Sequence, residues 1–223
     1  MTTTSTRPGW LLPAGLILFS LVPVVAGAAR VGQLSTGGEV TPDNARFFAS
    51  PVPVVVHIVT VSVYALLSAF QFAPGFRRRR PGWHRAAGRL LVPSGILAAS
   101  AGLWMTLFYP HPPSTGWLLT AIRLVFGSAW ILFLVLGFTA IRRWDVVRHR
   151  AWMMRAYAVG MGAGTQVFTL APMLAFGSPD RLSVALGHLA GWVINVVVAE
   201  WLIRRPTRRA GVSGRLIPAL ETR

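Results

Sequence analysis

Cysteine and lysine are both missing from this chain of 223 residues. Without cysteine there can be no disulfide framework, iron–sulfur cluster or thiolate zinc site, so any metal chemistry has to rest on histidine, carboxylate or methionine. Every basic side chain is arginine, which we interpret as compositional bias, because either basic residue would hold a loop in the cytoplasm. A Walker loop, a nucleophile elbow, a His-Glu-x-x-His zinc helix and a dinucleotide fingerprint are also missing, so catalysis of the soluble type has no visible carrier.

Charged residues are scarce. They make up 13% of the chain against 53% hydrophobic residues, and the mean hydropathy of +0.55 is too high for an ordinary water-soluble domain. The formal net charge of +16 would suit nucleic acid. A nucleic-acid-binding domain, however, carries its basic residues on a folded hydrophilic face, whereas these arginines lie between apolar runs. We therefore expect the lipid bilayer, and not nucleic acid, as the partner.

Apolar segments of about 20 residues recur along the chain, and each is long enough to cross a hydrocarbon core as a helix. No segment alternates polar and apolar residues over ten positions, so strands are not expected. The sequence predicts an all-α fold, a polytopic membrane helix bundle of about six transmembrane helices that forms one domain over residues 1–205. The predicted spans are 10–29, 52–72, 90–109, 117–141, 153–176 and 183–203. Residues 206–223 are expected to form a disordered, basic cytoplasmic tail.

Arginine marks alternate connections between these spans. Clusters occur at 77–89, 142–150 and 204–209, whereas the other connections carry few arginines. Positive charge stays on the cytoplasmic side, so both ends of this multi-pass protein are predicted to lie in the cytoplasm, with the plasma membrane as its location. The first span also has the pattern of a cleaved signal peptide, but its apolar run is long for one, and we expect an anchor. The external segment 31–50 has the composition of a solvated connection.

Polar residues follow one stripe of the second span. His57, Thr60, Tyr64, Ser68 and Gln71 are separated by three or four positions, which places them on one helix face. Polar groups at membrane depth are costly, so this stripe faces protein or a cavity. It either contributes to a functional site or forms a hydrogen-bonded packing seam.

The sixth span repeats this arrangement with His188, Gly191, Asn195 and Ala199. His57 and His188 both lie about 8 Å below the outer boundary at 1.5 Å per residue. We therefore expect these two histidines to face each other.

A second pair, His84 and His149, precedes the third and fifth spans at the opposite surface. Each histidine heads a helix face of small residues. On the third span these are Ala87, Gly88, Gly95, Ala98 and Gly102, and on the fifth Ala156, Gly160, Ala163 and Gly164. Such faces allow close approach of helices. Alternatively, they make room for a flat macrocycle whose iron takes imidazole ligands from two helices.

Arg123 lies about six residues into the fourth span, where its planar guanidinium can bind a carboxylate or a cofactor propionate. The alternative is that its side chain extends to the outer interface. We assign no role to His111, which lies between two prolines. Asp145 and Glu200 lie at the cytoplasmic edge among arginines and are expected to form local ion pairs.

With these residues in view, the chain resembles the DUF2306 family of predicted bacterial membrane proteins over roughly the second to fifth spans. The resemblance rests on His57 with Gln71-Phe72, His84-Arg85 with Gly88-Arg89, Gly102-Leu103-Trp104, and His149-Arg150 with Trp152-Met153 and Arg155-Ala156-Tyr157. The resemblance implies no particular activity. The family pattern has an arginine deeper in the fifth span, where this chain has Thr165-Gln166. By analogy of layout only, the four histidines are also similar to those of cytochrome b561-like dihaem proteins.

Three functions are compatible with these patterns. The first is a membrane redox protein carrying haem b, with His57 and His188 as outer ligands, His84 and His149 as inner ligands, and a redox partner protein. The second is a small proton-coupled transporter or channel lined by the two polar stripes, although no broken helix is visible in the sequence. The third is a cofactor-free scaffold whose polar groups only fasten helices together.

Overall fold

The computed structural model describes residues 10–112, 115–175, 177 and 180–205. Five long helices have the length and apolarity to cross a membrane: α1 (Leu11–Ser35), α3 (Pro51–Gln71), α5 (Pro81–Phe108), α6 (Trp117–Arg142) and α9 (Arg181–Arg204). Between them lie α2 (Ala45–Ala49), α4 (Pro74–Arg79), α7 (Val146–Gly160) and α8 (Gly162–Ala175). The described part of the chain contains no strand, so the predicted all-α membrane bundle is confirmed. The predicted tail, 206–223, lies outside the described residues.

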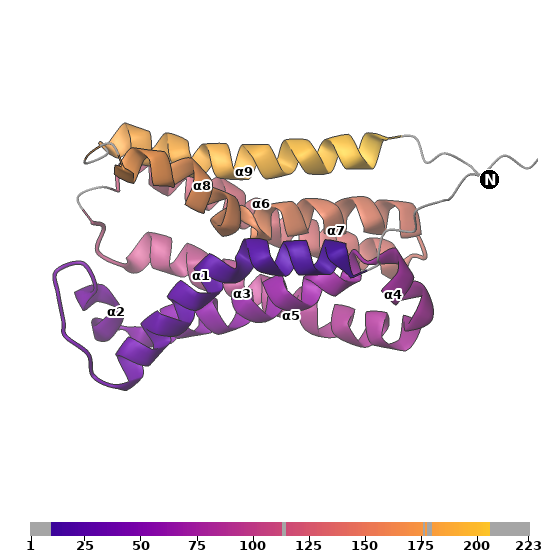
Figure 1. Cartoon of the computed structure of the whole chain (residues 1–223), viewed down its shortest axis with the longest axis horizontal. Helices are drawn as coiled ribbons and strands as arrows, with labels where there is room; N and C mark the ends of the chain where they lie inside the picture. Colours follow the sequence, from indigo (N-terminus) through magenta and orange to yellow (C-terminus); the bar gives the residue numbers. More distant parts are fainter. Residues whose placement is uncertain (1–9, 113–114, 176, 178–179, 206–223) are drawn as a thin grey trace, which may run out of the picture.

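The predicted fifth span, 153–176, is not one helix. It is divided at Met161 into α7 and α8, which are inclined to each other (Figure 1). The carbonyls of Ala158 and Val159, in the last turn of α7, accept hydrogen bonds from the side chains of Asn195 and Trp192 at 3.0 and 3.2 Å. Because α9 satisfies backbone groups at the break, irregular backbone is tolerated there at membrane depth.

The third span also differs from its predicted bounds. α5 begins at Pro81, nine residues before the predicted start at Leu90, and proline is favoured in the first turn of a helix. Its first turns carry Arg85 and Arg89, which a search for apolar runs excludes. The helix therefore extends beyond the apolar segment at the end of the bundle where the arginines gather.

Helices that follow one another pack as neighbours. α3 lies along α5, α6 along α7, and α8 along α9, while α1 covers α3 and α8. α1 begins and α9 ends at the same end of the bundle, on the side of α4 (Figure 1). The core holds aromatic and small side chains, among them Tyr64, Trp130 and Ala98. Large apolar side chains such as Leu18 and Val125 are exposed, as expected of surfaces that meet lipid.

Candidate functional site

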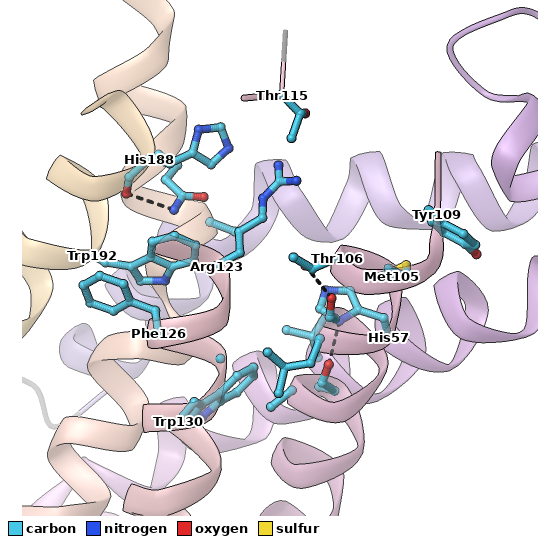
Figure 2. A pocket seen from close by; sticks show the side chains of 18 of the residues that line it. His57, Met105, Thr106, Tyr109, Thr115, Arg123, Phe126, Trp130, His188 and Trp192 are labelled. Atoms are coloured by element: carbon cyan, nitrogen blue, oxygen red, sulfur yellow. Dashed lines mark hydrogen bonds between the residues drawn. The ribbon is translucent and has the colours of Figure 1, made fainter. Parts of the chain in front are cut away.

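A cavity of about 380 Å³ opens at the end of the bundle opposite α4, where α2 lies. We name it the outer cavity, because the arginine distribution predicts that this end lies on the external side. α3 and α5 to α9 contribute to its wall, and α2 contributes Arg46 and Phe47. Figure 2 shows His188 and Arg123 above a group of indole and phenyl rings, with His57 across from these rings. This volume lies within the range of small-molecule sites.

His57 reaches the outer cavity from α3. Its Nδ1 lies 2.8 Å from the carbonyl oxygen of Ala98 on α5, where it donates its proton if the ring is the Nδ1–H tautomer. The ring packs against Gly102, where an added Cβ would lie 3.3 Å from Nδ1. The neighbouring helix thus fixes the orientation of the imidazole, and glycine provides its space.

His188 reaches the same cavity from α9. Its Nδ1 lies 2.8 Å from the carbonyl oxygen of Val184, one turn earlier in the same helix. The side chain of Gln166, on α8, donates to the backbone carbonyl of His188 at 3.2 Å (Figure 2). The structure therefore brings His57 and His188 to one cavity.

Two arginines lie in the outer cavity. Arg123 extends from α6, and its guanidinium points into the cavity beside His188 (Figure 2). Arg46 comes from α2, and its guanidinium stacks 4.5 Å from the centre of the Phe47 ring. The sequence analysis treated segment 31–50 as a solvated connection, and it missed this contribution. The signal available was an arginine followed by two phenylalanines in an otherwise polar loop.

His111 was also missed. It lines the outer cavity, and its Nε2 lies 3.1 Å from the carbonyl oxygen of Thr106. The two prolines that flank it hold the turn between α5 and α6 over the cavity. Because its contacts are local, we take His111 as part of the rim.

His84 and His149 lie away from the outer cavity, near the other end of the bundle. The Nδ1 of His149 lies 2.8 Å from the carbonyl oxygen of Gly137, and His84 is close enough to interact electrostatically with His149. Gln71 donates to the backbone carbonyl of His84 at 3.4 Å. Two buried atoms here, the Nδ1 of His84 and the Oε1 of Gln71, have no hydrogen-bond partner among the described residues. Buried polar atoms of this kind call for a water or a ligand.

The small-residue faces below these histidines are partly filled by neighbouring side chains, while Ala98, Gly102, Gly160 and Ala163 line the outer cavity. A Cβ added at Gly95 would lie 2.7 Å from a methyl group of Leu134 and 3.0 Å from the ring of Tyr64. One added at Gly160 would lie 2.8 Å from the ring of Trp130. Of the two explanations for these faces, the packing favours close approach of helices over open grooves. The outer cavity provides open space beside the pair His57 and His188.

Tyr64 and Asn195, the remaining members of the predicted polar set, have packing roles. Tyr64 is 3% exposed, and its ring lies edge-on to Trp130 with centroids 5.2 Å apart. Asn195 accepts a hydrogen bond from Thr165 at 2.6 Å and donates to the carbonyl of Ala158 at the helix break. Both polar stripes thus combine a cavity-lining histidine with groups that join helices.

The two carboxylates at the arginine-rich end of the bundle both form ion pairs, Asp145 locally as expected and Glu200 with an arginine of another helix. Asp145 begins α7, accepts a hydrogen bond from the backbone of Arg148 and pairs with its side chain at 3.3 Å. Glu200 is held by Arg155, which donates from Nε and Nη2 at 2.5 and 3.0 Å. No group of three or more histidine or carboxylate ligands converges within the described residues, so metal binding by protein ligands alone has no candidate there.

A family model described as "Predicted membrane protein (DUF2306)" matches residues 54–203, about two thirds of the chain. The match extends beyond the second to fifth spans through α9, so it includes His188 as well as the other three histidines of the two pairs. No curated protein and no solved structure matches the chain.

Proposed function

Because the chain belongs to the DUF2306 family, whose description states a membrane location and no activity, we propose a function from its own residues. In this proposal, the protein is a multi-pass redox protein of the plasma membrane with both ends in the cytoplasm, and it binds haem b through two histidine pairs. The observation that carries this proposal is the way the imidazoles are held. In His57, His149 and His188, Nδ1 lies 2.8 Å from a backbone carbonyl oxygen. An imidazole that donates from Nδ1 keeps Nε2 unprotonated, as an iron ligand requires.

The outer cavity fits such a group. His57 and His188 would supply one nitrogen each, and Phe126, Trp130 and Trp192 provide apolar surface below them. A bound haem supplies one-electron oxidation and reduction, and its potential depends on the polarity of the pocket and on the ligands. The protein contributes orientation through the carbonyl partners of the imidazoles, and it excludes lipid and water by its aromatic floor.

The inner pair supports a second site. The orientation of His149 is fixed by Gly137, and the unpartnered ring nitrogen of His84 is the kind of buried atom that a ligand would engage. Sites at both ends of the bundle would carry electrons across the bilayer, from a donor on one side to a partner protein on the other.

Absorption spectroscopy tests the proposal. Protein expressed with sufficient haem should show a Soret band and a sharp reduced α-band. His57→Ala or His188→Ala should remove one part of this absorption, and His84→Ala or His149→Ala the other part. His111→Ala is the matched control and should leave the spectrum unchanged. Folded protein that stays colourless with haem present would exclude stable haem binding.

A proton-coupled transporter is the second candidate, and the helix break favours it. Discontinuous helices beside a polar cavity are typical binding sites in transporters. Here Gly160 and Ala163, on either side of the break, line the outer cavity. Proton-coupled flux in liposomes should then fail in His57→Ala and persist in His111→Ala. Unchanged flux in His57→Ala would contradict this candidate. If the protein showed neither haem absorption nor proton-coupled flux, the scaffold function would be favoured.

A further inference from the structure

The outer cavity carries positive charge without an acidic group in its wall. Arg46 and Arg123 line it together with three histidines, whereas its described lining residues include no aspartate or glutamate. The two guanidinium groups therefore place like charges in one cavity. Like charges gathered at membrane depth are costly, which makes such a pair a functional candidate.

In the described part of the chain, neither arginine forms a direct ion pair. Within the described residues, no hydrogen bond or ion pair engages the guanidinium of Arg123. Burial lowers the pKa of Arg46, while Asp43, which does not line the cavity, acts in the opposite direction. Both groups remain cationic, because the arginine pKa lies far above neutral pH. A buried guanidinium that lacks a counter-ion is best satisfied by a planar anion that accepts two hydrogen bonds.

The aromatic side chains at the floor of the cavity indicate what the rest of the bound molecule is like. Phe126 and Trp192 stack with centroids 4.8 Å apart and planes inclined by 11°, and Trp130 lies beside them (Figure 2). Flat aromatic surfaces below a cationic mouth fit a molecule with an apolar, planar body and an anionic end. The N-terminus of α8, at the helix break, adds a partial positive charge at the depth of the cavity.

We infer that Arg46 and Arg123 form an anion subsite at the mouth of the outer cavity, which takes the carboxylate of a flat, largely apolar molecule lying on the Phe126–Trp192 stack. This inference deepens the proposed function, since it rests on the outer cavity as a ligand site, but it does not require iron. The carboxylate has two possible sources, a propionate of haem or a separate organic anion. Because Arg46 belongs to the external loop and Arg123 to a membrane helix, the bound anion also joins α2 to the bundle.

The first arm of the test uses an iron-free probe. Protein in phosphatidylcholine nanodiscs is titrated with 2-naphthoate and with the neutral 2-naphthalenemethanol. The acid should bind about tenfold more tightly than the alcohol, a difference of about 1.4 kcal/mol. Arg123→Gln and Arg46→Gln should each abolish this preference without weakening the alcohol. Arg142→Gln, an equal change of charge at the other end of α6 and outside the cavity wall, is the control and should preserve it.

The second arm identifies the source by comparing haem with its dimethyl ester, which lacks free carboxylates. A preference for haem that disappears in Arg123→Gln would assign the subsite to propionate. If the protein preferred naphthoate but bound no haem, the result would support the anion subsite and refute the haem function. Equal binding of acid and alcohol, or the same loss in Arg142→Gln, would overturn the inference. Displacement of naphthoate by phosphatidylglycerol in the discs would also overturn it, because the occupant would be a lipid phosphate.

Discussion

Asn195 is the polar side chain on which the helix break depends most directly, and its replacement by alanine is the most informative stability test. Asn195→Ala removes two hydrogen bonds, the one that it accepts from Thr165 at 2.6 Å and the one that it donates to Ala158 at 3.0 Å. The carbonyl of Ala158 then has no described side chain to bond at the end of α7. The substitution should therefore destabilise α7, α8 and α9 together.

The magnitude follows from the two bonds. Hydrogen bonds between membrane helices contribute about 0.6 kcal/mol on average and about 1.7 kcal/mol at most. Asn195→Ala should therefore lower the free energy of unfolding by about 1–3 kcal/mol. Thr165→Val, which removes only one of the bonds, should cost about 0.6 kcal/mol. The bond between the two side chains is lost in either variant, so their effects should not add.

Reversible unfolding in mixed detergent micelles, followed by circular dichroism, measures these differences. The double variant should be no less stable than Asn195→Ala alone, within about 0.5 kcal/mol. If Asn195→Ala costs no more than Thr165→Val, the carbonyl at the break is satisfied in some other way. Our account of why the chain tolerates irregular backbone at this depth would then be wrong.

Other substitutions test the packing, an ion pair and the orientation. Gly160→Ala should cost about 1–3 kcal/mol, because a Cβ there would lie 2.8 and 2.9 Å from the rings of Trp130 and Tyr64. Gly88→Ala, with open space around it, should be neutral or stabilising by up to about 1 kcal/mol. A lower melting temperature for Gly88→Ala than for Gly160→Ala would contradict this packing. Glu200→Gln should cost about 1–3 kcal/mol by weakening its bonds to a half-buried arginine, whereas an unchanged unfolding midpoint would show that the pair is solvated. Single cysteines before α2 and between α6 and α7 should react with impermeant reagents from opposite sides; reaction from one side would refute the predicted orientation.

Hydropathy and length predicted the long helices well, because burial in lipid demands both. The break at Met161 could not be predicted in the same way. Gly160, Gly162 and Gly164 weaken the helix there without requiring a break, and the groups that stabilise the break come from Asn195 and Trp192, more than 30 positions later. A local pattern carries no information about such distant partners.

The candidate site was predictable only in part, because the sequence gives the depth of a residue along a helix but not its tertiary contacts. Counting residues from a common boundary placed His57 and His188 at one depth, and both line the outer cavity. Arg46 and Phe47 could not be placed, since the position of a loop over a bundle depends on tertiary contacts. One such contact is the hydrogen bond from the hydroxyl of Tyr109 to the carbonyl of Ser50, which links the loop to the end of α5.

The division of one span into α7 and α8 constrains how the chain enters the membrane during synthesis. At 1.5 Å per residue, each piece is about 21–23 Å long, shorter than the hydrocarbon layer of about 30 Å. Neither helix alone is long enough to cross the hydrocarbon layer. The carbonyls of Ala158 and Val159 receive their side-chain partners only from α9, so we expect α7, α8 and α9 to reach their final packing together, after the last helix has been synthesised.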